Sequence, residues 1–61
     1  MEDLRVGNIY LDTLFGVILE ITKIEGGFVY YTVSKDNYKS EECNLLNEVI
    51  EELKDGYKKI Q

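Results

Sequence analysis

The stretch Ile21-Thr-Lys-Ile-Glu-Gly-Gly-Phe-Val-Tyr-Tyr-Thr-Val33 predicts a β-hairpin, and the fold depends on how its side chains divide between two faces. Gly26 and Gly27 occupy the two positions of a type I′ turn that require positive φ. The segments on either side are rich in β-branched and aromatic residues, which favour strands. A two-residue loop predicts three cross-strand pairs: Glu25 with Phe28, Lys23 with Tyr30, and Ile21 with Thr32. A three-residue loop with a bulge would shift this pairing, but both strands would still be apolar on both faces.

Strict alternation along this hairpin leaves large apolar side chains on both faces of the predicted sheet. One face carries Val17, Leu19, Ile21, Phe28 and Tyr30. The other carries Ile18, Ile24, Val29, Tyr31 and Val33. A single helix can cover only one face. The sheet must therefore curl into a partial barrel, fold back on its first strand, or pack on a second chain.

The rest of the chain predicts one more strand and one helix in a single domain spanning residues 1–61. After a short lead-in at residues 1–5, strands are expected at 6–12, 17–25 and 28–34, as an antiparallel β-meander. Residues 35–39 are polar and are expected to connect the sheet to a helix.

A C-terminal amphipathic helix is predicted over about residues 41–57. Ser40 is the expected N-cap. Apolar residues recur at helical spacing at Leu46, Val49, Ile50, Leu53 and Tyr57. The order β-β-β-α places the protein in the α+β class.

The chain has 61 residues, one cysteine and no histidine. A domain of this size buries little surface, and small domains often gain stability from disulfides, metals or partner subunits. Cys43 has no partner for an intramolecular disulfide, and a zinc site without histidine is disfavoured. The sequence therefore predicts no metal and no cofactor, and it favours self-association, for example as a homodimer.

No apolar run is long enough to span a membrane, and no basic leader followed by an apolar segment is present. A single unpaired cysteine suits a reducing compartment. We therefore expect a cytoplasmic protein with no membrane partner.

Twelve acidic residues and seven basic residues give the chain a net charge of −5. Proteins that bind nucleic acid neutralise phosphates with Lys and Arg, so this charge disfavours direct nucleic-acid binding. It suits a protein partner with a basic surface. The alternative is that the charge only keeps a small protein soluble.

The predicted helix carries an acidic stripe opposite its apolar side. The stripe consists of Glu41, Glu48, Glu51, Glu52 and Asp55, together with Asn44. Glu48 with Glu52, and Glu51 with Asp55, are like-charge pairs at i, i+4, and each costs a few tenths of a kcal/mol, about 0.2–0.5. One interpretation is a ridge that docks on a basic cleft. The other is an ordinary solvated helix face.

Tyr30 and Tyr31 are candidate partner-binding residues, because tyrosine is favoured at interfaces. They must point to opposite faces of a strand, so at most one is expected in the core. Cys43, in the first turn of the predicted helix, is expected to be a small buried hydrophobe. The chain has no Cys-His pair and no glycine-rich phosphate loop, so we expect a non-catalytic protein.

The pattern VGNIYLD, a turn, then GVILEITKIEGGFVYYTV over Val6 to Val33 resembles the strand-turn-strand layout of small Tudor- or KOW-like barrels. In its whole-chain character, small, acidic and without proline or histidine, the protein is similar to phage and prophage accessory proteins, including anti-CRISPR and anti-restriction inhibitors. This second resemblance implies an inhibitor that blocks the nucleic-acid-binding surface of a host defence protein such as a CRISPR nuclease. The alternative is a structural or assembly subunit that self-associates through the apolar second face of its sheet.

Overall fold

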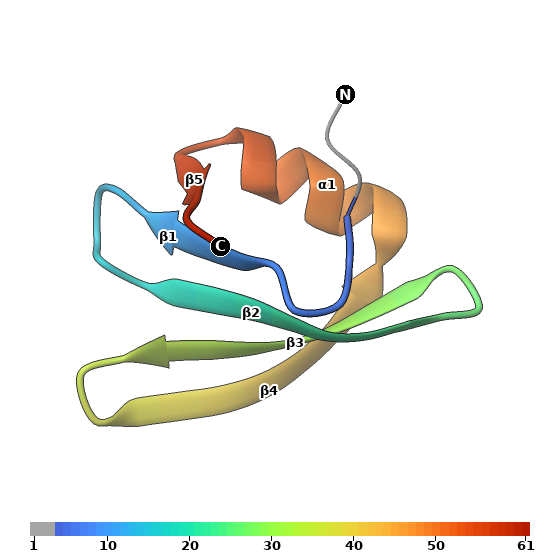
Figure 1. Cartoon of the computed structure of the whole chain (residues 1–61), viewed down its shortest axis with the longest axis horizontal. Helices are drawn as coiled ribbons and strands as arrows, with labels where there is room; N and C mark the ends of the chain where they lie inside the picture. The colour runs from blue at the N-terminus through green and yellow to red at the C-terminus, as the bar shows by residue number, and fades with distance from the viewer. Residues whose placement is uncertain (1–3) are drawn as a thin grey trace.

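A computed structural model describes residues 4–61, and it confirms the α+β class. Residues 1–3 of the expected lead-in lie outside the described part of the chain. The elements are β1 (Ile9–Asp12), β2 (Ile18–Glu25), β3 (Phe28–Lys35), β4 (Tyr38–Leu45), α1 (Leu46–Lys54) and β5 (Tyr57–Lys59). They form one five-stranded antiparallel sheet in the order β4-β3-β2-β1-β5, and α1 lies over one of its faces (Figure 1).

The hairpin of β2 and β3 has the predicted turn. Gly26 and Gly27 have φ values of 60° and 80°, and Glu25 pairs with Phe28 as expected. The pairing of Lys23 with Tyr30 is confirmed as well.

The predicted pairing of Ile21 with Thr32 is wrong, because a β-bulge shifts the register between Ile21 and Lys23. Ile21 instead lies opposite Tyr31, which leaves Thr22 as the extra residue of β2. The Thr22 hydroxyl donates a hydrogen bond of 3.1 Å to the Tyr30 carbonyl oxygen, which ties the bulged residue to the neighbouring strand.

The bulge determines which side chains share a face. A one-residue shift moves every side chain beyond it to the opposite face. Leu19 and Ile21 therefore lie on the same face as Val29 and Tyr31, although strict alternation would separate them. The two apolar sets of the hairpin thus contribute most of their side chains to one core.

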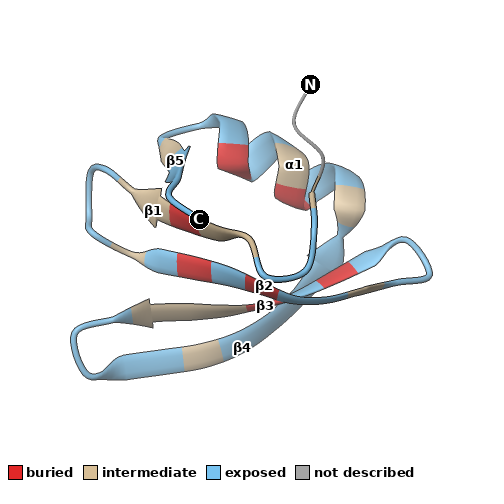
Figure 2. Cartoon of the chain, in the orientation of Figure 1, coloured by how far each residue is buried: buried red, intermediate tan, exposed pale blue. Residues whose placement is uncertain are grey.

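This core lies between the sheet and α1, as the buried positions in Figure 2 show. Its members are Tyr10 from β1, Leu19 and Ile21 from β2, Val29 and Tyr31 from β3, and Val49 and Leu53 from α1. We call the other face of the sheet, which α1 does not cover, the open face. Because the bulge places most apolar side chains of the hairpin on the face that α1 covers, the open face does not have to be covered by further strands of a barrel.

Residues 38–45 form strand β4, so the predicted connection at 35–39 and the predicted helix start at 41 are wrong. Asp36 has a φ of 54°, and Lys35 pairs with Tyr38, so the chain turns back in a second two-residue loop. Ser40 lies in this strand and is no N-cap. The helix begins at Leu46, and its N-cap, Leu45, makes no side-chain capping bond.

The helix ends at Lys54, three residues before the predicted end. Gly56 has a φ of 93°, which lets the chain turn into β5. Tyr57 therefore belongs to a strand and lies opposite Asp12 of β1. It still faces the core, because it packs against the core cluster.

The sheet does not close into the partial barrel that we considered, because β4 and β5 are its two separate edges. The first strand also begins later than predicted, at Ile9. Gly7 and Asn8 precede it and bond to the bulge region: the Gly7 N–H donates to the Ile21 carbonyl (2.8 Å), and the Ile21 N–H donates to the Asn8 carbonyl (3.0 Å).

Deletion of Thr22 should prevent cooperative folding, because Leu19 and Ile21 would then face away from the core. Thr22→Val keeps the extra residue and removes only the hydrogen bond from the Thr22 hydroxyl to the Tyr30 carbonyl. The free energy of unfolding of this variant should be about 1 kcal/mol lower than that of the parent protein. Urea unfolding followed by circular dichroism measures both. A deletion variant that unfolds like the parent would show that the bulge does not determine the fold.

Candidate functional site

Four carboxylates lie on the outer side of α1 and its C-terminal cap. Glu48, Glu51, Glu52 and Asp55 are all exposed. They lie opposite Val49 and Leu53, whose side chains are buried against the sheet. The spacing that predicted an acidic stripe is therefore confirmed for these four residues, and we keep the name acidic stripe for them.

The acidic stripe is poorly neutralised. Within residues 4–61 its only ion pair joins Glu51 to Lys54 at 3.9 Å, between two exposed side chains. Exposed pairs of this kind contribute about 0–1 kcal/mol, so Lys54 compensates little of the repulsion. The pairs Glu48 with Glu52 and Glu51 with Asp55 remain at like-charge spacing along the helix axis.

Glu41 was also predicted on this stripe, and the structure places it elsewhere. It lies on β4 opposite Thr32, on the open face of the sheet. The reason is that residues 38–45 extend the sheet, so Glu41 follows a period of two and not the helical period.

The two tyrosines are divided between the faces, as predicted. Tyr31, a predicted partner-binding residue, is only 5% exposed, so its side chain belongs to the core and presents little surface to a partner. Tyr30 is 37% exposed on the open face, where the Lys23 ammonium lies 5.3 Å from its ring centre. Tyr30 and the acidic stripe are thus on opposite sides of the molecule.

Cys43 is exposed, which corrects the prediction of a buried hydrophobe in a helix. It lies on β4 opposite Tyr30. Within the described residues, no group of three or more His, Cys, Asp or Glu side chains is placed to hold a metal ion.

Glu52 is close enough to the core to influence two tyrosines. Burial raises the pKa of the Tyr31 phenol, and the charges of Glu52 and Glu42 raise it further, against a hydrogen bond from the Asn44 side-chain amide (2.7 Å). Burial also raises the pKa of Tyr57, with Glu52 and Asp12 acting in the same direction. The charge of Glu52 therefore disfavours ionisation of both phenols.

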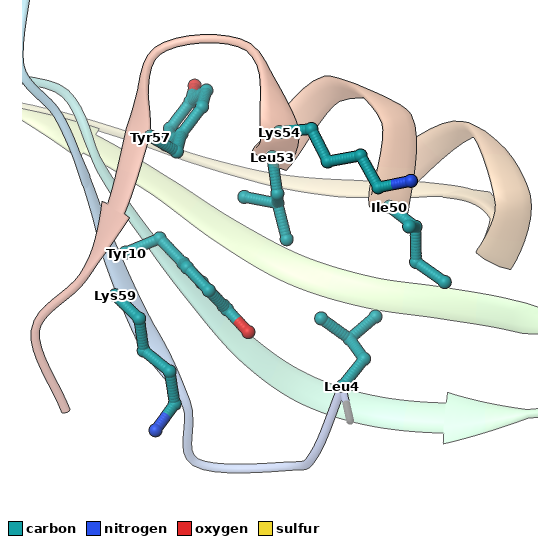
Figure 3. A pocket seen from close by; sticks show the side chains of 7 residues that line it. All are labelled: Leu4, Tyr10, Ile50, Leu53, Lys54, Tyr57 and Lys59. Carbon is teal, nitrogen blue, oxygen red and sulfur yellow. The ribbon is translucent and has the colours of Figure 1, made fainter. Parts of the chain in front are cut away.

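A shallow cavity of about 300 Å³ opens between α1, β1 and β5 (Figure 3). Its lining residues are Leu4, Tyr10, Ile50, Leu53, Lys54, Tyr57 and Lys59. Figure 3 shows the ammonium groups of Lys54 and Lys59 on opposite sides of the apolar side chains. No nucleophile–base pair lines the cavity. Sequence reasoning missed it because it depends on β5.

Comparison of the sequence with protein-family models and with curated proteins, and comparison with solved structures, found no match. Among the described residues, no helix is long and apolar enough to cross a membrane, since α1 has nine residues. The assignment of a function therefore depends on the surfaces of this chain.

The open face has a different chemistry from the acidic stripe. Ile18, Phe28, Tyr30 and Leu45 are between 37% and 49% exposed on it. Its charges balance, because the acidic residues Glu20, Glu25 and Glu41 are matched by Lys23, Lys39 and Lys58. Within residues 4–61, the excess negative charge therefore lies away from this face.

A second exposed apolar feature is the tip of the loop between β1 and β2. Leu14 is 77% exposed and Phe15 is 62% exposed. The Asp12 carboxylate accepts hydrogen bonds from both of their backbone N–H groups, at 2.8 and 3.3 Å. The tip therefore holds two apolar side chains in solvent on an ordered turn.

The raised pKa values of Tyr31 and Tyr57 predict a loss of stability in alkali. A neutral phenol is favoured in the fold, so its contribution is complete below the ordinary tyrosine pKa of 10.0 and disappears as the pH rises through the raised value. Tyr57→Phe should reduce the fall in the free energy of unfolding between pH 9 and pH 11.5, values chosen to bracket that ordinary pKa of about 10.

Urea unfolding at the two pH values measures this fall. Tyr38→Phe, at a position 64% exposed, is the matched control and should keep the fall of the parent protein. Equal falls in the parent and in Tyr57→Phe would contradict the assignment to Tyr57.

Proposed function

We propose that the protein is a non-catalytic acidic binding module whose stripe on α1 docks on a basic, nucleic-acid-binding surface of another protein. The observation that carries this proposal is the row Glu48, Glu51, Glu52 and Asp55, exposed along one rigid helix with one weak ion pair. The proposed role is that of a phage-type inhibitor of a host defence protein, such as a CRISPR nuclease, acting in the host cytoplasm.

The physical support for this role is electrostatic. The helix that carries these charges is already ordered by its packing on the sheet. Binding a partner therefore orders only the side chains of the carboxylates, and little other conformational entropy is lost. A complementary basic patch would raise the association rate and fix the orientation of the complex. Such a contact weakens with salt, because the Debye length falls from about 10 Å at 0.1 M to about 3 Å at 1 M.

Glu48→Lys combined with Glu52→Lys should abolish binding to the partner while the fold survives, because both side chains are exposed. Tagged protein incubated with nuclease-treated bacterial lysate, and washed at low and high salt, should retain a nucleic-acid-binding protein at low salt only. The purified partner should then lose nucleic-acid binding when the parent protein is added, and should keep it when the double variant is added.

Glu20→Lys combined with Glu25→Lys is the control, since it changes the net charge equally but on the open face. This control should bind like the parent. Normal binding by the Glu48 and Glu52 double variant would show that the stripe is not the contact surface.

The second candidate function is an assembly subunit that self-associates through the open face. The observation that favours it is the adjacent exposed pair Phe28 and Leu45, which lie opposite each other in β3 and β4 and extend toward Tyr30. Apolar side chains grouped on a face without net charge suit a second copy.

Phe28→Asp should make such an assembly monomeric, because it places a carboxylate at the centre of the apolar contact. Leu14→Asp makes the same change in charge at the loop tip and should stay associated. Light scattering on a size-exclusion column measures the mass. A parent protein that is monomeric at high concentration would contradict the assembly role.

A further inference from the structure

Among residues 4–61, no strand pairs with the outer side of β4. This strand spans eight residues, from Tyr38 to Leu45, at one end of the sheet order. In Figure 1 it forms the border of the sheet farthest from β5, and the hairpin of β3 and β4 extends beyond α1. The opposite edge, β5, has only three residues.

The backbone groups that face outward follow from the turn. In a two-residue loop the Tyr38 N–H donates to the Lys35 carbonyl, so this pair is hydrogen-bonded and every second pair after it is too. Hydrogen-bonded and non-hydrogen-bonded residue pairs thus alternate along β3 and β4. The hydrogen bond from the Leu46 N–H to the Gly27 carbonyl (2.9 Å), just beyond the end of β4, fits this alternation. The N–H and C=O groups of Lys39, Glu41 and Cys43 therefore point away from β3.

On the open face of this edge, the side chains on the two sides of Ser40 have opposite charges. Lys39 and Glu41 lie on the open face, one on each side of Ser40 in sequence. Tyr38 and Glu42 flank the same residue on the face toward the helix. A strand of this pattern is complementary to its own reverse.

We propose that β4 pairs antiparallel with β4 of a second copy, about a two-fold axis at Ser40. In this register Lys39 lies opposite Glu41 of the second copy, and the relation is repeated by symmetry. Tyr38 lies opposite Glu42 in the same way. The outward backbone groups of Lys39 and Glu41 meet those of the second copy as hydrogen-bonded pairs.

Charge selects this register over its neighbours. A shift of the axis to Lys39, Glu41 or Glu42 would set that residue opposite itself, and like charges placed directly opposite are unfavourable. A shift to Cys43 would place the two thiols side by side. Charged residues on an edge strand usually oppose pairing with another strand. Here Lys39 and Glu41 have opposite signs, so their charges favour one register of pairing between two copies.

The pairing would join two five-stranded sheets into one continuous sheet and leave both acidic stripes exposed. It therefore goes beyond the proposed binding function and uses neither the stripe nor the apolar residues of the open face.

Complementary charge reversals test the proposal. Lys39→Glu alone, or Glu41→Lys alone, opposes like charges twice and should weaken self-association about tenfold. An equal mixture of the two variants restores opposite signs and should form a heterodimer, as the double variant Lys39→Glu with Glu41→Lys should form a homodimer. Sedimentation over a concentration series to about 1 mM, the range of weak association, measures all four.

Two results would overturn the proposal. The first is self-association of both single variants as strong as that of the parent, and the second is a parent that stays monomeric at the highest concentration. If Phe28→Asp loses self-association while the charge variants at Lys39 and Glu41 keep it, the contact between copies lies on the open face and not at β4. Loss of partner binding in the helix variants has no bearing on this experiment, so the two proposals fail separately.

Disulfide trapping tests the register itself. Ser40→Cys in a Cys43→Ser background should give a covalent dimer under mild oxidation, because residues on the axis lie about 5 Å apart. The parent protein should not form a covalent dimer through Cys43, since the Cys43 thiols of the two copies would be separated by roughly 20 Å along the strands. Crosslinking of the parent through Cys43, without crosslinking at position 40, would overturn the Ser40 register.

Discussion

The extra residue at Thr22 is the constraint on which the rest of the structure depends. The hairpin that contains it has more apolar side chains than one helix could cover if they were divided evenly between two faces. By shifting the register between Ile21 and Lys23, the bulge gathers Leu19, Ile21, Val29 and Tyr31 on one side. Because one face then carries most of the hydrophobic surface, a nine-residue helix is enough to complete the core.

The same shift separates the two surfaces for which we propose binding roles. The helix must lie on the apolar face, so its outer side, with the acidic stripe, is exposed to solvent. The open face retains a few exposed apolar residues, such as the neighbouring pair Phe28 and Leu45, among balanced charges. One irregularity in β2 therefore separates an electrostatic surface from a nearly neutral one.

The sequence was sufficient to predict the glycine turn, β2, β3 and the apolar side of the helix, because each has a strong local signal. It could not show the bulge, since Thr22 is an ordinary strand residue and both registers leave apolar side chains on each face. Strand β4 was missed because an exposed edge lacks hydrophobic alternation, and Ser40-Glu41-Glu42 imitates the start of a helix. Tyr57 was assigned to the helix because its spacing fits both a helix and a returning strand.

The pairing of β5 with β1 has a consequence for the order in which the sheet folds. The meander of β1 to β4 pairs neighbouring segments of the chain, but β1 gains its second partner only when residues 57–59 fold back onto it. Contacts between segments so distant along the chain form late, because a long loop must close first. Until β5 pairs with β1, Tyr10 and the inner side of β1 lack the cover of Tyr57, so a chain with an unpaired β5 exposes part of its core.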